Sequence, residues 1–168
     1  MSTPVGEIIL AGDRDRLSQL HLITDGGSRP FALPSDWVAA PLFREAEEQL
    51  QQYFQKKRRA FDLPLDPQGT DFQKSVWKAL RNIPYGRVAS YKAIAREIGC
   101  EKGARAVGLA NARNPLPIII PCHRVIGSNG SLGGFAYGLR MKKMLLQLEE
   151  NPGSDGADQD QDMQPRLF

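Results

Sequence analysis

The stretch "TDFQKSVWKALRNIPYGRVASYKAIAREIG" (Thr70–Gly99) contains two helix signals in succession. Thr70 and Ser90 each carry a hydroxyl that can accept a hydrogen bond from the backbone of a first helical turn. After Thr70, apolar residues recur at helical spacing until a Pro-Tyr-Gly break. After Ser90, the second run stops at Gly99, a residue typical of helix ends. We therefore predict two capped helices here, the first with an apolar face of Phe72, Val76, Trp77, Leu80 and Ile83.

A third helix is expected shortly afterwards. The segment "ARAVGLANAR" (104–113) ends before Asn114-Pro115, where proline disfavours helical backbone in the residue that precedes it. The residues "CEKGA" (100–104) join this helix to the one before it, and the pair is typical of a helix-turn-helix. Such pairs also occur in many all-helical domains, so the pair alone does not establish a DNA-binding role.

The remainder of this half contains three further segments. "PIII" (117–120) is expected to be a short buried strand or extended segment, and "SNGSLGGFAYG" (128–138) a glycine-rich turn or hairpin. "LRMKKMLLQLEE" (139–150) reads as a final amphipathic helix. From Asn151 onward the chain has almost no apolar content, and we expect disorder.

The N-terminal part has a different pattern. "VGEIILAGDRDRLSQLHLIT" (5–24) alternates apolar and polar residues on both sides of a turn, which predicts two strands. "WVAAPLFREAEEQLQQYFQKK" (37–57) predicts a helix to about Lys57. The prolines of "FDLPLDPQG" (61–69) indicate a linker. We predict an α+β fold with a small α/β domain over 1–66, a mostly helical domain over 67–150 and a disordered acidic tail over 151–168.

The charge of the chain is unevenly distributed. Residues 70–149 contain 13 Lys or Arg and 4 Asp or Glu, a net charge of +9, although the whole chain carries only +3. Residues 1–69 carry −2 and residues 150–168 carry −4. A basic segment favours a nucleic-acid partner, and the alternative is a merely solvated basic surface.

Several classes of protein are disfavoured by composition. No apolar run approaches the roughly 20 residues that span a bilayer, and the start, "MSTPVGEIIL", lacks a signal peptide pattern. We therefore expect a cytoplasmic protein with free thiols and no membrane partner. The chain has two Cys and two His, and a zinc site would need all four, including the adjacent Cys122 and His123. We expect no metal and no cofactor.

The adjacent pair in "PCHRV" (121–125) is the strongest chemical signal from the residues themselves. A thiol becomes a good nucleophile as a thiolate, and a neighbouring base lowers its pKa. His123 can accept the proton of Cys122, and it then needs an acid to orient it. Glu149, late in the final helix, is one candidate. The alternative is a buried structural cysteine beside a surface histidine.

The motifs together resemble the O6-alkylguanine-DNA alkyltransferase family. The resemblance is carried by "PCHRVIG", the preceding "NP", the glycine-rich "GSLGGFAYG", "GTDFQKSVWKALRNIPYGRVASYKAIAREIG", "ARAVGLANARNP" and "KKMLLQLE", all in the family's order and spacing. It covers residues 69–150 closely and the N-terminal part in outline. It implies a ribonuclease H-like N-terminal domain, a winged helix-turn-helix, and irreversible single-turnover transfer of an alkyl group from a flipped-out base to the protein.

Site residues implied by the resemblance follow from matching positions. Cys122 is the alkyl acceptor, with His123 as its water-bridged base and Glu149 as the acid that orients His123. Asn114 braces the turn near the cysteine, and Tyr91 donates a proton or hydrogen bond to the leaving guanine. Arg105 enters the duplex where the base was. Further substrate or DNA contacts are expected from Ser90, Ala106, Asn111, Val125, Ala136, Tyr137 and Gly138.

The implied partner is double-stranded DNA that carries O6-alkylguanine, with O4-alkylthymine as a second substrate. The small residues of "AVGLANA" (106–112) allow close approach to a groove without reading its sequence, as a repair protein requires. Relatives commonly have "GYxGG" at the turn where this chain has "GGFAYG". We therefore expect Tyr137 to narrow the pocket and disfavour bulky adducts.

The last five residues, Gln164–Phe168 ("QPRLF"), resemble short peptides that bind bacterial sliding clamps, although an arbitrary chain end is the alternative. We expect a monomer. Three other functions are alternatives: a non-catalytic lesion-binding relative, a helix-turn-helix regulator and a cysteine hydrolase. The first would lack Cys122, and the second does not explain "PCHRV". The third usually brings its Cys and His together from distant parts of the sequence.

Overall fold

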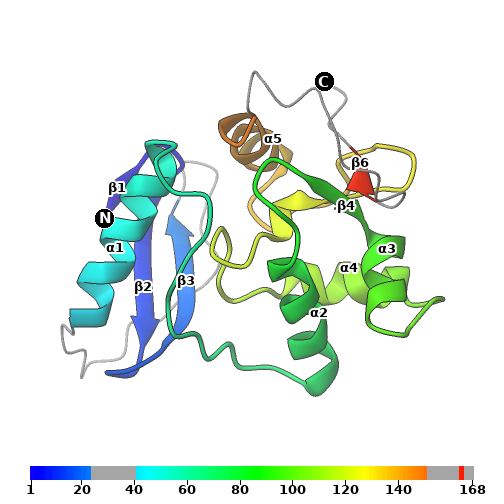
Figure 1. Ribbon diagram of the computed structural model, residues 1–168, viewed down its shortest axis with the longest axis horizontal. Coiled ribbons are helices and arrows are strands. Elements are labelled where there is room, and N and C mark those ends of the chain that lie inside the picture. The colour runs from blue at the N-terminus through cyan, green and yellow to red at the C-terminus, as the bar shows by residue number, and fades with distance from the viewer. Residues whose placement is uncertain (24–40, 151–162, 165–168) are drawn as a thin grey trace. The chain divides into compact units, whose positions relative to one another are not determined.

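The computed structural model describes residues 1–23, 41–150 and 163–164 and divides into two compact units. The first unit comprises Met1–Gln68 and Pro115–Ile119, and the second comprises Gly69–Asn114 and Ile120–Phe168. The chain is an α+β protein (Figure 1). Within the described ranges, no helix has both the length and the apolar character that crossing a membrane requires.

The first unit contains an antiparallel sheet of β1 (Ser2–Thr3), β2 (Gly6–Gly12) and β3 (Leu17–Ile23), in that order. The two predicted strands are confirmed. Ile8 pairs with Leu22 and Leu10 with Leu20, and all four side chains are buried because alternate residues face the same side.

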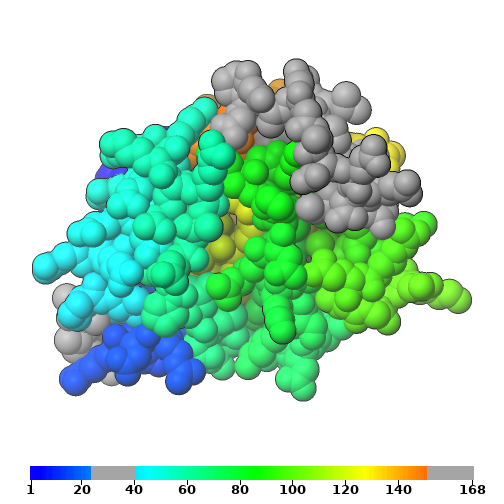
Figure 2. Space-filling model, viewed as in Figure 1, coloured from blue at the N-terminus to red at the C-terminus, as the bar shows by residue number. Residues whose placement is uncertain are grey.

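Helix α1 (Pro41–Phe54) supplies the other apolar surface of this unit. Figure 2, drawn from the same side as Figure 1, shows part of α1 at the molecular surface in cyan. Its buried face contains Leu42, Ala46, Leu50 and Tyr53, as the spacing predicts. The helix ends three residues before the predicted Lys57, because Lys56 turns to a positive φ of 60°. The predicted beginning of this helix, before Pro41, lies outside the described residues.

The second unit begins with α2 (Asp71–Arg81), which has the expected cap. Thr70 Oγ1 accepts a hydrogen bond from the Gln73 amide at 3.3 Å, and Gln73 Oε1 accepts one from the Thr70 amide at 2.9 Å. Trp77 is 2% exposed, and its Nε1 donates to the Ala110 carbonyl oxygen at 3.0 Å. Phe72, which was predicted on the same apolar face, lies in the first turn and is 36% exposed.

Helices α3 (Tyr91–Glu97) and α4 (Ala104–Ala112) follow as predicted, and α4 packs against both α2 and α3. Ser90 caps α3 by accepting a hydrogen bond from the Ala93 amide at 3.0 Å. Gly99 ends the helix with φ of 71°, a conformation that glycine adopts without strain.

Three short strands complete the second unit with α5 (Leu139–Leu148). Strand β4 (Val88–Ser90) pairs in parallel with β5 (Val125–Ile126) and antiparallel with β6 (Met163–Gln164). The rest of the predicted tail, 151–162 and 165–168, lies outside the described residues. The predicted "PIII" segment is buried, but it forms single β-bridges at Pro117 and Ile120 and no strand, with a turn between them in which Ile118 has φ of 76°.

Candidate active site

The cysteine of "PCHRV" lies in a single turn of 3-10 helix, η1 (Cys122–Arg124). Two asparagines hold the backbone around this turn. Asn114 Nδ2 donates to the Ile120 carbonyl oxygen at 2.8 Å, and Asn111 Nδ2 donates to the Cys122 carbonyl oxygen at 3.2 Å. Cys122 is 4% exposed. Side chains from the end of α4 therefore fix the position of the buried thiol.

The next two residues of η1 bind one carboxylate. His123 Nε2 lies 2.8 Å from Glu149 Oε1, and both side chains are fully buried. Arg124 makes a two-pronged contact with Glu149, from Nε and from Nη2, each at 2.9 Å. Arg124 also donates to the Ile83 carbonyl oxygen at 2.6 Å, and Glu149 accepts from the Gly86 amide at 3.2 Å. The cluster thus joins η1 to the end of α5.

The charge state of this cluster follows from its contacts. Burial alone would raise the pKa of Glu149, but the charge of His123 and hydrogen bonds from His123 and Arg124 lower the pKa well below its usual range. Glu149 is therefore a carboxylate at neutral pH. Its interaction with Nε2 fixes the orientation of the His123 ring, the task of the third member of a nucleophile–base–acid chain.

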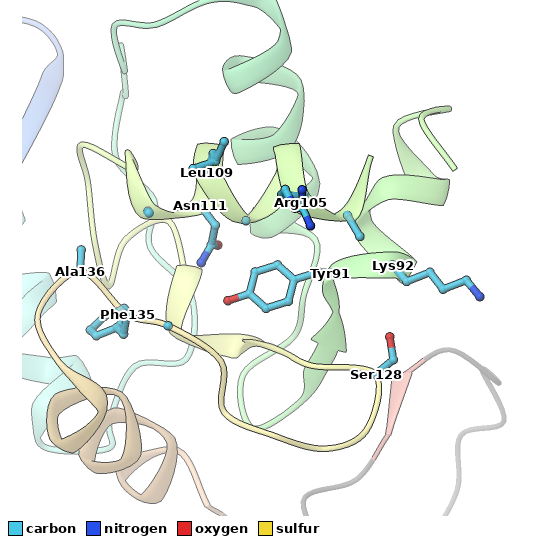
Figure 3. A pocket seen from close by; sticks show the side chains of 12 residues that line it. Tyr91, Lys92, Arg105, Leu109, Asn111, Ser128, Phe135 and Ala136 are labelled. Atoms are coloured by element: carbon cyan, nitrogen blue, oxygen red, sulfur yellow. The ribbon is translucent and has the colours of Figure 1, made fainter. Parts of the chain in front are cut away.

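A cavity of about 600 Å³ lies beside this cluster in the second unit. Figure 3 shows Tyr91 of α3 and Asn111 of α4 directed into it, with Phe135 and Ala136 of the glycine-rich loop on another side. A purine base fits such a volume, which lies in the usual range for small-molecule sites. The full lining is Tyr91, Lys92, Ala104, Arg105, Gly108, Leu109, Asn111, Ala112, Ser128, Gly134, Phe135 and Ala136.

Tyr91 lies in the middle of the cavity (Figure 3), and neighbouring glycines leave room for its ring. A Cβ at Gly133, where φ is 63°, would lie 3.1 Å from the Tyr91 ring and 3.2 Å from its hydroxyl oxygen. A Cβ at Gly108 would lie 3.8 Å from the ring, in ordinary contact. Burial, and to a lesser degree negative charge at Cys122, raises the pKa of Tyr91, so its hydroxyl stays protonated and can donate.

Lys142 is a functional candidate that the sequence analysis missed. Its side chain is fully buried, and Nζ donates to the carbonyl oxygens of Val125 and Leu132, with Gly134 at 3.5 Å. Burial lowers the pKa of Lys142 to about 8, although negative charge at Cys122 opposes that shift. Lys142 therefore connects α5 to β5 and to the glycine-rich loop that lines the cavity.

The structure separates the predicted site residues into two groups. Tyr91, Arg105, Asn111 and Ala136 line the cavity. The buried cluster behind it contains Cys122, His123, Asn114 and Glu149, and Asn111 connects the two groups through the Cys122 carbonyl.

Five predicted contacts lie elsewhere than the cavity wall. Ser90 caps α3, Ala106 is exposed on α4, and Val125 is buried in β5. Gly138 donates its amide to the Phe135 carbonyl oxygen at 3.0 Å, within the loop. Tyr137, which we expected to narrow the pocket, packs its ring 6.0 Å from that of Phe135, and Phe135 is the aromatic residue that lines the cavity.

Other cavity residues were not predicted, among them Lys92, Leu109, Ser128 and Phe135. Helical spacing could have revealed Lys142, because it shares one face of α5 with residues three, four and seven positions later. These are Leu145, Leu146 and Glu149, all buried. No comparable pattern distinguishes the loop residues Ser128 and Phe135, whose positions depend on the loop's path.

Both halves of the chain match domains of the same protein family. Residues 1–67 match the ribonuclease-like domain of 6-O-methylguanine DNA methyltransferase, and residues 71–151 match its DNA-binding domain. The chain is 54% identical to the methylated-DNA–protein-cysteine methyltransferase of Methanosarcina barkeri, over 90% of this chain and 95% of that protein. It is 44% identical to the constitutive methylated-DNA–protein-cysteine methyltransferase of Bacillus subtilis, over 88% of this chain and 91% of that protein.

Solved structures agree with these matches. The crystal structure of Mycobacterium tuberculosis OGT in complex with DNA superposes with a TM-score of 0.79 at 45% identity, over 89% of each chain. The crystal structure of O6-methylguanine methyltransferase from the same organism gives a TM-score of 0.78 at the same identity and coverage. Both the fold and the order of the two domains are therefore shared with these proteins.

Proposed function

The chain belongs to the 6-O-methylguanine DNA methyltransferase family, and on that basis we propose that Cys122 is the residue that receives the alkyl group. The protein is a methylated-DNA–protein-cysteine methyltransferase that repairs DNA by alkyl transfer. A non-catalytic binding protein or a regulator is not favoured, because the relatives are named as cysteine methyltransferases. The observation that carries the assignment is a buried thiol held next to the hydrogen-bonded His123–Glu149–Arg124 cluster.

The first step is loss of the thiol proton. His123 Nε2 is engaged by Glu149, so we assign proton transfer from Cys122 to Nδ1, directly or through a water molecule. Glu149 stabilises the imidazolium that forms. Arg124 balances the carboxylate, so the cluster gains a single positive charge when the thiolate appears.

The second step is a single displacement at carbon. The Cys122 thiolate attacks the alkyl carbon, a sulfur–carbon bond forms, and the bond from that carbon to O6 breaks. The electron pair of the broken bond goes to the guanine, which takes up a proton for which Tyr91 is the donor in the cavity. The His123 imidazolium proton then returns to Tyr91 through water, so overall the thiol proton ends on guanine and the alkyl group ends on Cys122. The thioether product is stable, so each molecule acts once.

We propose that α3 and α4 form a winged helix-turn-helix that binds duplex DNA carrying O6-alkylguanine. Cys122 is 4% exposed, and a base inside a duplex cannot reach a buried atom without leaving the stack. Arg105 is an exposed cation at the cavity rim, from where its guanidinium can fill the gap in the duplex. O4-alkylthymine is a second candidate substrate, and we propose that the protein acts in the cytoplasm as a monomer.

Mass spectrometry after incubation with a duplex containing O6-methylguanine tests the acceptor. We expect the intact protein to gain one CH2 and the adduct to map to the peptide with Cys122. Cys100→Ser is the matched control, because Cys100 is the other of the chain's two cysteines and lies in the turn between α3 and α4. Cys100→Ser should be alkylated and Cys122→Ser should not. An adduct on any other residue would refute the assignment.

We further propose that Gln164–Phe168 binds a bacterial sliding clamp. What supports this is the Gln-x-x-Leu-Phe pattern near a run of acidic and polar residues. Of these five residues, the structure describes only Gln164, whose backbone pairs with Val88. Retention on immobilised clamp should be lost when Leu167 and Phe168 are both changed to alanine and kept when Arg166 is changed. Equal retention of all forms would refute the proposal.

A further inference from the structure

Four consecutive cations follow helix α1 in the first unit. They are Lys56, Lys57, Arg58 and Arg59, and we call them the basic turn. Residues 1–69 contain 8 Lys or Arg and 10 Asp or Glu, so without the basic turn this part of the chain would carry a net charge of −6. Lys56, Lys57 and Arg59 are exposed, and Arg58 is half-buried. Half of the positive charge of an otherwise acidic segment is therefore concentrated at one place on its surface.

The backbone of the basic turn closes α1 in a Schellman motif. The Lys56 amide donates to the Tyr53 carbonyl oxygen at 2.9 Å, and the Lys57 amide donates to the Gln52 carbonyl oxygen at 2.8 Å, which are the two bonds of that motif. The motif places Lys56 in the left-handed region, with φ of 60°. Glycine is the usual residue at this position, because a Cβ makes the left-handed conformation less favourable. The chain therefore has a lysine where glycine would favour folding.

Side chains hold the basic turn in one conformation. Arg58 Nε donates to Gln52 Oε1 at 2.8 Å, and Arg58 Nη1 donates to the Ala60 carbonyl oxygen at 3.1 Å. Just beyond the turn, the buried Gln49 side chain donates to the Asp62 carbonyl oxygen at 2.8 Å and accepts from the Asp62 amide at 2.9 Å. Arg58 thus serves the turn itself, and the three exposed cations are displayed together on a fixed loop.

Two ordinary explanations of such a cluster do not apply to its lysines. Cations in the last turn of a helix interact favourably with the helix dipole, but the last turn of α1 contains no basic residue, and the effect falls off within that turn. Surface lysines also form ion pairs, but neither Lys56 nor Lys57 has an ion-pair partner within the described ranges. Concentrated positive charge of this kind attracts an anion from outside the molecule.

We propose that Lys56, Lys57 and Arg59 form a contact surface for the phosphate backbone of duplex DNA, in addition to the basic second unit. The proposal rests on the proposed function, which makes duplex DNA the partner. Duplex DNA carries one negative charge for about every 1.7 Å of its axis, so several neighbouring cations can each meet a phosphate. Phosphate contacts do not read sequence. The surface therefore binds undamaged DNA as well as damaged DNA and lengthens the time that the protein spends on DNA while it searches.

The salt dependence of binding to an undamaged duplex tests this surface. Affinity is measured by fluorescence anisotropy from about 50 to about 200 mM salt, where each phosphate contact contributes about 0.9 to the slope of log affinity against log salt. Replacing Lys56, Lys57 and Arg59 together with glutamine should reduce that slope by about 2–3 and weaken binding at least about tenfold at 100 mM salt.

The matched control replaces Arg14, Arg16 and Arg44 with glutamine. These three residues are exposed, belong to the same unit and remove the same charge, but they are scattered among acidic residues such as Asp13 and Glu45. The control should keep the wild-type slope. A wild-type slope in the basic-turn variant, or an equal reduction in both variants, would refute the proposal.

Lys56→Gly separates DNA binding from folding. Glycine removes the charge and favours the left-handed backbone, so urea unfolding should show stability at or above that of wild type while the slope falls by about 0.9. A less stable Lys56→Gly would overturn the argument that this lysine does not serve folding, and an unchanged slope would overturn the contact. The proposed function is tested separately, because undamaged DNA requires no alkyl transfer: wild-type protein that is not alkylated by a duplex containing O6-methylguanine would refute that function whatever the slopes.

Discussion

Replacing Lys142 with methionine should remove a pH-dependent part of the protein's stability. Methionine has a similar length and shape but no charge, so it fills the buried space between α5 and the glycine-rich loop. Burial lowers the pKa of Lys142 from its ordinary 10.5 to about 8. An unfolded chain returns the lysine to water, where its ordinary pKa applies. Between these two pH values the unfolded state therefore binds a proton that the folded state does not.

The size and sign of the effect follow from this difference. The free energy of unfolding rises with pH wherever the unfolded state holds more protons, by about 1.4 kcal/mol for each pH unit per proton. For Lys142 the rise begins near pH 8 and ends near pH 10.5, which makes it on the order of 3 kcal/mol in total. Below pH 8 both states carry the charge, and this contribution to the pH dependence disappears.

Urea unfolding of the wild-type protein and of Lys142→Met, from about pH 7 to about pH 11, measures the effect. The stability of wild type relative to the variant should increase across the window. Lys143→Met, which removes a charge from the exposed neighbouring residue, should show no such increase. A difference between wild type and Lys142→Met that is constant from pH 8 to pH 10.5 would refute the reasoning.

Three other changes have defined outcomes. Glu149→Gln leaves the buried Arg124 charge without its carboxylate and should cost about 3–5 kcal/mol in urea unfolding. Folding lowers the pKa of Glu149, so ionised Glu149 stabilises the folded protein above the ordinary pKa of a glutamate, and this contribution is lost on acidification. Glu149→Gln should therefore lose less stability than wild type as the pH falls. Identical dependence of the unfolding free energy on acid pH in the two proteins would contradict this. Gly133→Ala should slow methyl transfer about tenfold or more, because the new Cβ would meet the Tyr91 ring. Gly130 has a similar positive φ, but a Cβ there would have no atom within 4 Å, so Gly130→Ala should react at the wild-type rate. Leu109 is 60% exposed at the cavity rim and should contact DNA, so Leu109→Ala should slow alkyl transfer from duplex DNA several-fold while leaving stability within about 0.5 kcal/mol of wild type. Leu139→Ala is its control, because Leu139 is 51% exposed and does not line the cavity. Equal transfer rates for the two variants would count against a DNA contact by Leu109.

Local signals predicted most of the elements in the second unit. Capping by Thr70 and Ser90 and the stop at Gly99 are interactions within one helical turn, so the residues themselves specify them. The Cys122–His123 pair was also visible locally. The residues alone made Glu149 one candidate for its acid, and the family resemblance was needed to single it out, because the contact crosses 26 residues of sequence.

Other features depend on the tertiary structure. Two adjacent lysines have opposite environments, because Lys142 lies on the buried face of α5 and Lys143 on the exposed face. The composition of the glycine-rich loop indicated a turn but could not show that Phe135, and not Tyr137, would line the cavity. Ile118 has a positive φ that its residue type disfavours, and only the surrounding packing can impose it.

The segment Pro115–Ile119 has a consequence for synthesis of the chain. It belongs to the first unit, although the second unit supplies the residues on both sides of it. The Leu20 amide donates to the Pro115 carbonyl oxygen at 2.8 Å, so β3 gains a hydrogen bond from a part of the chain made much later. During translation, residues 1–68 therefore leave the ribosome before the first unit can be completed. Its last piece arrives only with Ile119, just ahead of Cys122, so the N-terminal unit cannot finish folding before α3 and α4 have been synthesised.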